Sequence, residues 1–249
     1  MKKTICLLAT LFLAFVSSYA QEEADKPHFE AGFYMSSSRV WRGCLSTSSP
    51  VMMPELSFNA GGFSAYLWGC SSVSQNYNEF DFGLSYSFPC GITVELADYF
   101  YPWCQGFAPD EPEEPCYNIF NYDNHTTGHQ LDLMLKWEPE NIPVHAMWST
   151  IMFGDDKNDE DAREAYSSYL EAGVYHEWEE AGRIDFTAGA CLWRSDSVYE
   201  VEKFSVINLD LNYSKTFDLG RVSIPLEVHG ILNPVARSPY FVFCAGITF

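Results

Sequence analysis

The last twelve residues of the chain read "SPYFVFCAGITF" (238–249) and contain no charged side chain. From Phe241 to Phe249, every second position carries an apolar side chain, and the positions between include Cys244, Gly246 and Thr248. Strict alternation of this kind predicts a β-strand with two different faces. One face is apolar along its whole length, so we expect it to meet an apolar environment rather than water.

The same alternation recurs through the chain, for example in "FDFGLSYSF" (80–88), "IDFTAGACLW" (184–193) and "INLDLNYS" (207–214). Twelve segments read this way, and most are about as long as the 9–11 residues that a tilted strand needs to cross a bilayer. The predicted strands lie near 28–38, 52–60, 63–72, 78–88, 92–102, 128–138, 143–153, 164–177, 183–193, 203–216, 221–232 and 239–249.

The connections between these segments alternate between tight turns, such as Gly61-Gly62, and longer polar stretches, such as 103–127. This alternation is typical of outer-membrane barrels, and in lipid a sheet must close because an unpaired edge is costly. We therefore predict an all-β fold, a transmembrane antiparallel up-and-down β-barrel of about twelve strands. If successive residues of the strand alternate strictly between the two faces, Asp98 falls on the apolar face. The alternative is a secreted β-sandwich, because alternation alone does not say which solvent the apolar face meets.

The N-terminus has the three regions of a secretory signal peptide. Lys2 and Lys3 precede the apolar run "ICLLATLFLAFV", and the small residues Ser18 and Ala20 follow it. We expect cleavage after Ala20, so that 1–20 is the signal peptide and 21–249 is the barrel. After residue 20 no run of about 18 apolar residues predicts a transmembrane helix.

The composition is strongly acidic, with a formal net charge of −20. Loss of Lys2 and Lys3 from the 14 basic residues leaves 12 against 34 acidic ones, a charge of −22. Such a chain is a poor partner for nucleic acid, whose phosphates require Lys and Arg. The cysteine and histidine spacing indicates no metal, and no cofactor is expected.

Seven cysteines follow the predicted cleavage site, and an odd number cannot pair completely within one chain. Cys104 and Cys116 flank one loop and are the expected disulfide, because export leads to an oxidising compartment. Their loop, 103–127, is rich in proline and aromatic residues. It either folds into the lumen or binds a ligand outside the membrane.

The polar faces of the predicted strands carry many more acids than bases. The acids expected to line the lumen are Glu30, Glu55, Glu79, Asp81, Glu95, Asp132, Glu171, Asp185, Asp210 and Glu227. The bases expected there are Arg42 and Lys136. Rings of Asp and Glu favour cations in pores, so this lining predicts passage of small solutes or cations. Alternatively, the carboxylates only hydrate the interior of a barrel that transports nothing.

Two short motifs carry a resemblance to a known family. The first strand region contains Val40-Trp41-Arg42-Gly43, and "LWG" stands at 67–69. These motifs resemble the TorF-type porins and related Bacteroidetes outer-membrane proteins. In that family an aromatic-Arg-Gly element ends strand one and an aromatic-Trp-Gly element ends a later strand, and Leu67, Trp68 and Gly69 stand at the second. The terminal Phe249 resembles the assembly signal read by the barrel-assembly machinery. The resemblance implies a passive porin in the bacterial outer membrane, with membrane lipid as its surroundings.

Two further readings stay open. A barrel phospholipase would need a serine, a histidine base and an orienting group. The candidate histidines are His129, His145, His176 and His229, and none lies in a recognisable motif, so we expect no enzyme. A calcium site in "GDDKNDEDARE" (154–164) would use Asp155, Asp156, Asn158, Asp159 and Asp161. This stretch lacks the glycine that calcium loops carry at their sixth position.

Overall fold

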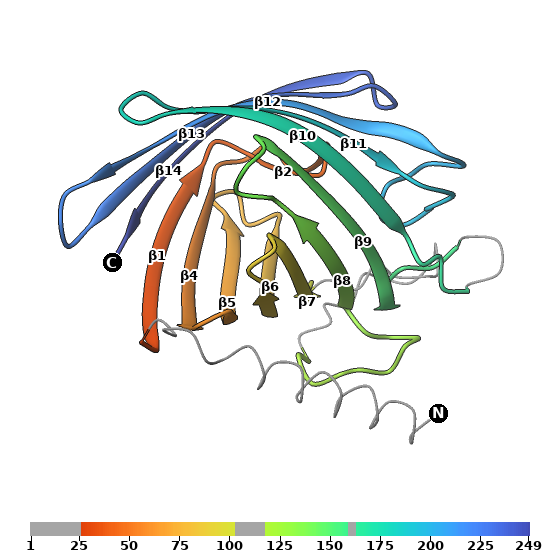
Figure 1. Ribbon diagram of the computed structural model, residues 1–249. Helices are drawn as coiled ribbons and strands as arrows, with labels where there is room; N and C mark the ends of the chain where they lie inside the picture. The colour runs from red at the N-terminus through yellow and green to blue at the C-terminus, as the bar shows by residue number, and fades with distance from the viewer. Residues whose placement is uncertain (1–25, 103–117, 159–162) are drawn as a thin grey trace.

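The computed structural model describes residues 26–102, 118–158 and 163–249, which form a closed barrel of antiparallel strands (Figure 1). The predicted signal peptide and the predicted Cys104–Cys116 disulfide lie outside these ranges. The barrel strands are β1 (His28–Ser36), β4 (Val51–Ala60), β5 (Phe63–Ser72), β6 (Asn78–Ser87), β7 (Ile92–Phe100), β8 (His129–Trp137), β9 (Val144–Gly154), β10 (Ser168–Trp178), β11 (Gly182–Cys191), β12 (Ser205–Asp218), β13 (Ser223–Asn233) and β14 (Ser238–Thr248). The prediction of an all-β, twelve-stranded antiparallel barrel is confirmed, and each predicted range overlaps one of these strands.

Each barrel strand pairs with the next one along the chain, with one exception. β1 pairs with β4, because the two short strands between them, β2 (Arg39–Trp41) and β3 (Cys44–Thr47), form a separate sheet. The ring closes where Gly32 to Ser36 of β1 pair with Cys244 to Thr248 of β14. Each barrel strand therefore has a hydrogen-bonded neighbour on both sides, as closure requires.

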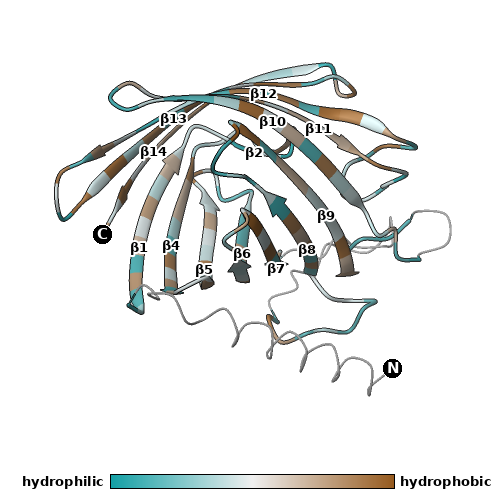
Figure 2. Ribbon diagram, in the orientation of Figure 1, coloured by the Kyte–Doolittle hydropathy of each residue, from teal (hydrophilic) through white to brown (hydrophobic). Residues whose placement is uncertain are grey.

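The apolar residues of the strands lie on the outer face of the barrel. In β6, Phe80 and Phe82 are exposed, whereas Glu79 and Asp81, at the alternate positions, are buried. In β14, Phe241 is 76% exposed, and its neighbour Val242 is buried. Figure 2 shows hydrophobic and hydrophilic residues alternating along several of the strands. The burial pattern is thus the reverse of that in a water-soluble domain, in which large apolar side chains gather inside.

The two ends of the barrel differ in their connections. At one end the strands are joined by short turns over 61–62, 88–91, 138–143, 179–181 and 219–222, and the barrel's first and last strands also have their free ends here. At the other end the connections over 37–50, 101–128, 155–167 and 192–204 are longer, although 73–77 and 234–237 are short. Within the described ranges, no helix is long and apolar enough to cross a bilayer.

Candidate functional site

The main feature of the barrel interior is a small hairpin formed by β2 and β3, which we call the lumen hairpin (39–47). Arg42 and Gly43 form its two-residue turn with φ values of 50° and 81°. Positive φ at both central residues is the geometry of a type I′ hairpin turn. The expectation that the Val40–Gly43 motif ends the first barrel strand is wrong. β1 ends at Ser36, and the motif turns into the barrel.

The turn of the lumen hairpin touches the wall formed by β12 and β13. The Asn233 Nδ2 amide donates a hydrogen bond of 3.1 Å to the carbonyl oxygen of Gly43. A Cβ atom on Gly43 would lie only 2.0 Å from the carbonyl oxygen of Ile207. Glycine is therefore required here both for the positive φ and for the close approach of two backbones.

Arg42 anchors the hairpin to the wall on the other side. Its Nη2 donates to Asp132 Oδ2 of β8 at 2.8 Å, and its Nη1 donates to the Tyr199 hydroxyl at 2.8 Å. The guanidinium also lies 4.3 Å from the centre of the Trp41 ring. The Arg42 side chain is 6% exposed and that of Asp132 is 0% exposed, so this is a buried ion pair. Buried charges of this kind require such partners.

Arg39 makes a second, looser anchor. Its Nη2 lies 3.5 Å from Glu79 Oε2, and its guanidinium lies 4.7 Å from the centre of the Trp68 ring. Glu79 also accepts hydrogen bonds from Tyr77 at 2.6 Å and from Tyr101 at 3.0 Å. The lumen hairpin thus crosses the interior and contacts β6, β8, β12 and β13.

Loop residues hold Tyr199 against the hairpin. The Asp156 carboxylate accepts from the Ser167 amide at 2.7 Å and from the Ser167 hydroxyl at 2.6 Å. The same hydroxyl contacts Ser195 Oγ, which accepts from the Tyr199 amide at 3.0 Å. The Tyr199 ring then stacks on Trp41 with 5.7 Å between centroids. Asp156, a candidate calcium ligand, therefore fixes the position of a loop. Candidates Asp159 and Asp161 lie outside the described residues.

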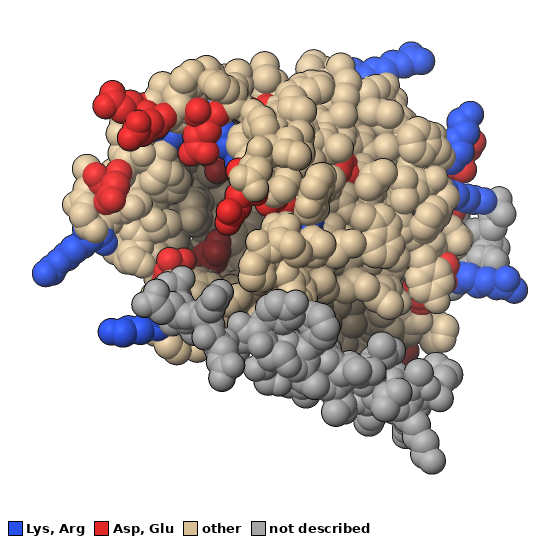
Figure 3. Space-filling view, viewed as in Figure 1, with Lys and Arg blue, Asp and Glu red and all other residues tan. Residues whose placement is uncertain are grey.

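Several of the predicted lumen acids have a basic neighbour. Glu95 accepts from Lys136 at 2.6 Å and from the Tyr66 hydroxyl at 3.0 Å. Asp185 accepts from Arg183 at 2.8 Å and contacts His145 at 3.0 Å. These pairs hold part of the acidic charge in place. Figure 3 shows acidic side chains around and inside a hollow on one face of the molecule.

The remaining acids lie in more varied surroundings. Glu171 accepts from the Tyr169 hydroxyl at 2.8 Å, and Glu30 lies 3.4 Å from both His28 and Asn59. Asp81 is buried, with one oxygen lacking a partner among the described residues. Glu55 lies on the same inward-facing side of β4 as the buried residues Met53 and Ser57.

Sequence reasoning missed Arg39 and Arg183 as lumen bases. Arg183 could have been found, because it lies two residues from Asp185 and therefore on the same face of β11. Arg39 could not, because strand periodicity does not predict that the chain turns inward after Ser36.

Two cavities lie on either side of the lumen hairpin. The larger one, which we call the vestibule, has a volume of about 800 Å³ and is lined by Trp41, Cys44 and the loops at the long-connection end. The smaller one, the inner cavity, has a volume of about 190 Å³ and is lined by Val40, Arg42 and residues of β12 to β14. They share no lining residue, so the hairpin separates them.

Asp155 lines the vestibule just beyond the end of β9. Burial raises the pKa of its carboxyl to about 6, and the nearby Asp156 adds to the rise while Lys157 opposes it. The charge of the vestibule therefore changes in mildly acidic solution.

Asp98 faces outward, as strict parity predicts, and it is covered there. Its Oδ1 lies 2.7 Å from His129 Nδ1, and its Oδ2 accepts from the Tyr122 hydroxyl at 2.6 Å. The Tyr122 ring stacks on His129 at 4.1 Å, and His129 Nε2 lies 2.9 Å from the Ile119 carbonyl oxygen. Residues 119–122 thus fold over the outer wall and cover the Asp98–His129 pair.

The other candidate histidines lie in separate places. His145 contacts Asp185 and Thr187 in the lumen, His229 lies between Asp210 and Glu227, and His176 packs edge-on against Trp178. The described cysteines, Cys44, Cys70, Cys90, Cys191 and Cys244, are free. Among described residues, no group of three or more metal-binding side chains is arranged to hold an ion.

These features define a closed twelve-stranded up-and-down barrel with a hairpin packed inside it. No protein-family model and no curated protein sequence matches the chain. The solved structures similar to it include the COG4313 outer membrane channel from Pseudomonas putida F1. That match has 12% sequence identity and a TM-score of 0.44, and it covers 88% of this chain and 93% of the channel.

Proposed function

We propose that this protein is an outer-membrane β-barrel that gives small solutes passive passage through an acidic, cation-preferring lumen narrowed by the lumen hairpin. The observation that carries the proposal is the reversal of burial: large apolar side chains cover the outer wall, and charged side chains line the interior. The proposal includes no enzymatic activity.

The outer wall matches the surroundings that a bilayer offers. Phe82, Leu96, Phe186 and Phe243 belong to different strands, and all are exposed on the outer face. Monomeric soluble proteins rarely expose large contiguous apolar patches. A closed barrel with an apolar outer band and a polar interior is the form in which β-strands cross membranes.

The interior supports a narrow route. The vestibule and the inner cavity lie on either side of the lumen hairpin, so a solute that passes must move around or displace the hairpin.

The cation preference follows from charge. Ten acidic positions line the predicted lumen, and the Arg and Lys side chains paired with them are Arg39, Arg42, Lys136 and Arg183. The excess of carboxylates attracts cations.

Location and assembly belong to the same proposal. The signal peptide at 1–20 would direct export, and the terminal Phe249 would be read by the barrel-assembly machinery. Kinship with the TorF-type porins is part of the proposal and rests on the short sequence motifs at 40–43 and 67–69.

Planar-bilayer recording tests the proposal. Reconstituted wild-type protein should give discrete conductance steps with a reversal potential that favours cations. The pair of substitutions Glu30→Gln and Glu55→Gln should reduce this preference while leaving the anchors of the hairpin intact. Asp218→Asn, at the exposed end of β12, is the matched control and should leave selectivity unchanged.

A second candidate is a barrel that does not conduct and acts through its outer loops as a binding or structural protein. The tight packing of Arg42 against Asp132 and Trp41 favours it, because this packing fills the centre of the barrel. Silent bilayers in which insertion has been verified by protease protection would support this candidate and contradict the channel.

A further inference from the structure

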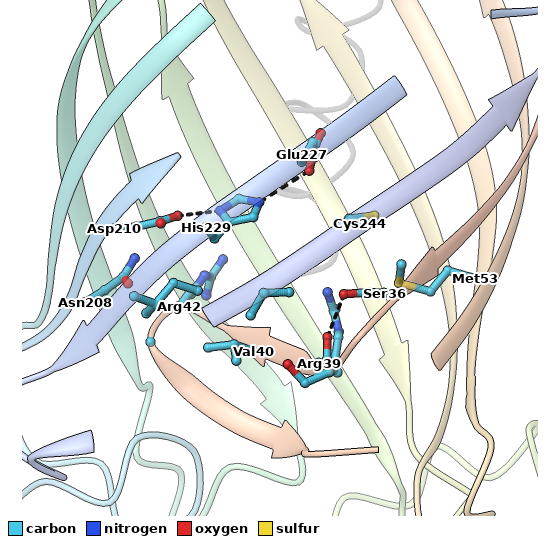
Figure 4. A pocket seen from close by; sticks show the side chains of 14 residues that line it. Ser36, Arg39, Val40, Arg42, Met53, Asn208, Asp210, Glu227, His229 and Cys244 are labelled. Carbon is cyan, nitrogen blue, oxygen red and sulfur yellow. Dashed lines mark hydrogen bonds and ion pairs between the residues drawn. The ribbon is translucent and has the colours of Figure 1, made fainter. Parts of the chain in front are cut away.

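The inner cavity lies between the lumen hairpin and the inner faces of β12, β13 and β14. Figure 4 shows Asn208, Asp210 and His229 on one side of it and Ser36 and Arg39 on the other. The two sides differ in charge and in hydrogen-bonding capacity, and this difference indicates what the cavity binds.

Asn208 presents an acceptor on the β12 side. Asn208 is 7% exposed, and its Nδ2 donates to the Tyr169 hydroxyl at 3.1 Å. The Tyr169 hydroxyl in turn donates to Glu171 at 2.8 Å, so it can only accept from Asn208. The amide orientation is thereby fixed, and Asn208 Oδ1 has no hydrogen-bond partner among the described residues. A buried acceptor in this state requires a donor from elsewhere.

Asp210 adds a second acceptor two residues further along the same face of β12. Its Oδ2 lies 2.9 Å from His229 Nδ1, whereas its Oδ1 is buried and has no partner in the described part of the chain. Glu227 lies 3.4 Å from His229 Nε2 on the other side of the ring. Two carboxylates therefore share one imidazole, and this wall of the cavity suits a cationic group with several donors.

The hairpin side of the cavity carries positive charge. Arg39 Nε is buried and has no partner within the described residues, and the contact of Arg39 with Glu79 is long, at 3.5 Å. Arg42 also lines the cavity, beside Asn208 (Figure 4), and its charge is paired with Asp132. A guanidinium with a free N–H suits a carboxylate. The cavity is thus negative and rich in acceptors on one side and positive on the other.

We infer that the inner cavity binds a small zwitterion with an ammonium group and a carboxylate, the class of the free amino acids. The ammonium group meets Asn208 and Asp210, and the carboxylate meets Arg39. The inference rests on the proposed function, in which such a solute enters the barrel, and it names the substrate class of that route. The volume of about 190 Å³ restricts the ligand to a small member of the class.

Equilibrium binding of labelled L-alanine to the purified protein in detergent tests the inference, with propylamine and propionate as competitors that each carry one of the two charged groups. Unlabelled alanine should compete at least about tenfold better than either one, because each lacks a charge-assisted contact. Asp210→Asn and Arg39→Gln should each weaken alanine binding by about tenfold or more. Val242→Phe should abolish binding by filling the cavity without changing its charge.

Matched controls lie on β12 but outside the cavity. Asp218→Asn and Lys215→Gln each remove one charge and should leave binding unchanged, and heat-modifiable migration on gels confirms that each variant is folded. Unchanged alanine affinity in Asp210→Asn and Val242→Phe, or equal competition by propylamine, would overturn the inference. If the protein conducts ions but binds no alanine, the amino-acid site is contradicted and the channel is not. One that binds alanine in silent bilayers contradicts the channel and supports the site.

Discussion

Arg42 and Asp132 are 90 positions apart in the chain, and they meet inside the barrel in a hydrogen-bonded ion pair of 2.8 Å. Arg42 belongs to the turn of the lumen hairpin and Asp132 to the wall strand β8. The pair therefore fixes the hairpin across the interior of the barrel. If the protein acts as the proposed channel, both its stability and its conductance depend on this pair.

Removal of one partner of this pair should strongly reduce the free energy of unfolding. Arg42→Met leaves the Asp132 carboxylate buried without a cation, and we expect a loss of about 3–5 kcal/mol in the free energy of unfolding. The double variant Arg42→Met/Asp132→Leu should lose much less, because no charge is left unpaired. Denaturant unfolding in detergent, followed by tryptophan fluorescence, measures both. Equal losses in the single and double variants would show that the pair is not what anchors the hairpin.

Gly43→Ala should displace the lumen hairpin and leave the barrel closed. The new Cβ atom would lie 2.0 Å from the Ile207 carbonyl oxygen, so the turn must move away from β12. We expect single-channel conductance to rise severalfold as the constriction loosens. The control is Gly220→Ala, at a glycine with φ of 91° and no atom within 4 Å of the added Cβ, which imposes backbone strain without a clash. A conductance increase of equal size in both variants would contradict the mechanism.

Stability should depend on pH through Asp155. Its pKa in the folded protein, about 6, is above its value in the unfolded chain, so the folded state favours the uncharged carboxyl. The stabilisation is complete below about pH 4 and is lost as pH rises through about 6. Asp155→Asn should therefore be more stable than the wild type at neutral pH, by at most about 3 kcal/mol, and the difference should vanish near pH 4. Unfolding midpoints measured across this range decide the point, with Asp218→Asn as control.

The Asp98–His129 pair on the outer wall gives a separate prediction. His129→Leu removes the ring that contacts the Asp98 carboxylate and should reduce the free energy of unfolding by about 2 kcal/mol or more. The double variant His129→Leu/Asp98→Leu should recover much of this loss, because the outer wall is apolar there. A double-mutant cycle with no coupling between the two residues would rule out the pairing.

The barrel strands could be predicted from the sequence because alternation of apolar and polar residues is a local property. The lumen hairpin could not. Its strands are only three and four residues long, and what fixes them is contact with distant residues such as Asp132 and Asn233. The presence of Arg42 in the lumen was predicted from parity, but its partner depends on how the strands are arranged around the closed barrel.

The same distinction applies to the candidate site. Parity predicts that Glu95 and Lys136 face inward, and the register that pairs Glu95 with Met134 and Thr93 with Lys136 then brings the two charges together. Asp98 was assigned to the outer face correctly. Its contact with Tyr122 could not be predicted, because Tyr122 lies in the connection between β7 and β8, which has no periodic sequence pattern.

The proposed function depends most directly on which solvent meets each face of the strands. A nitroxide scan of single-cysteine variants along β14 in reconstituted bilayers measures this, in a background from which the native cysteines have been removed. Labels at Phe241, Phe243 and Ile247 should be accessible to oxygen dissolved in lipid, and labels at Val242, Cys244 and Gly246 to a water-soluble nickel complex. Equal accessibility to the nickel complex at all six positions would contradict a membrane-spanning barrel.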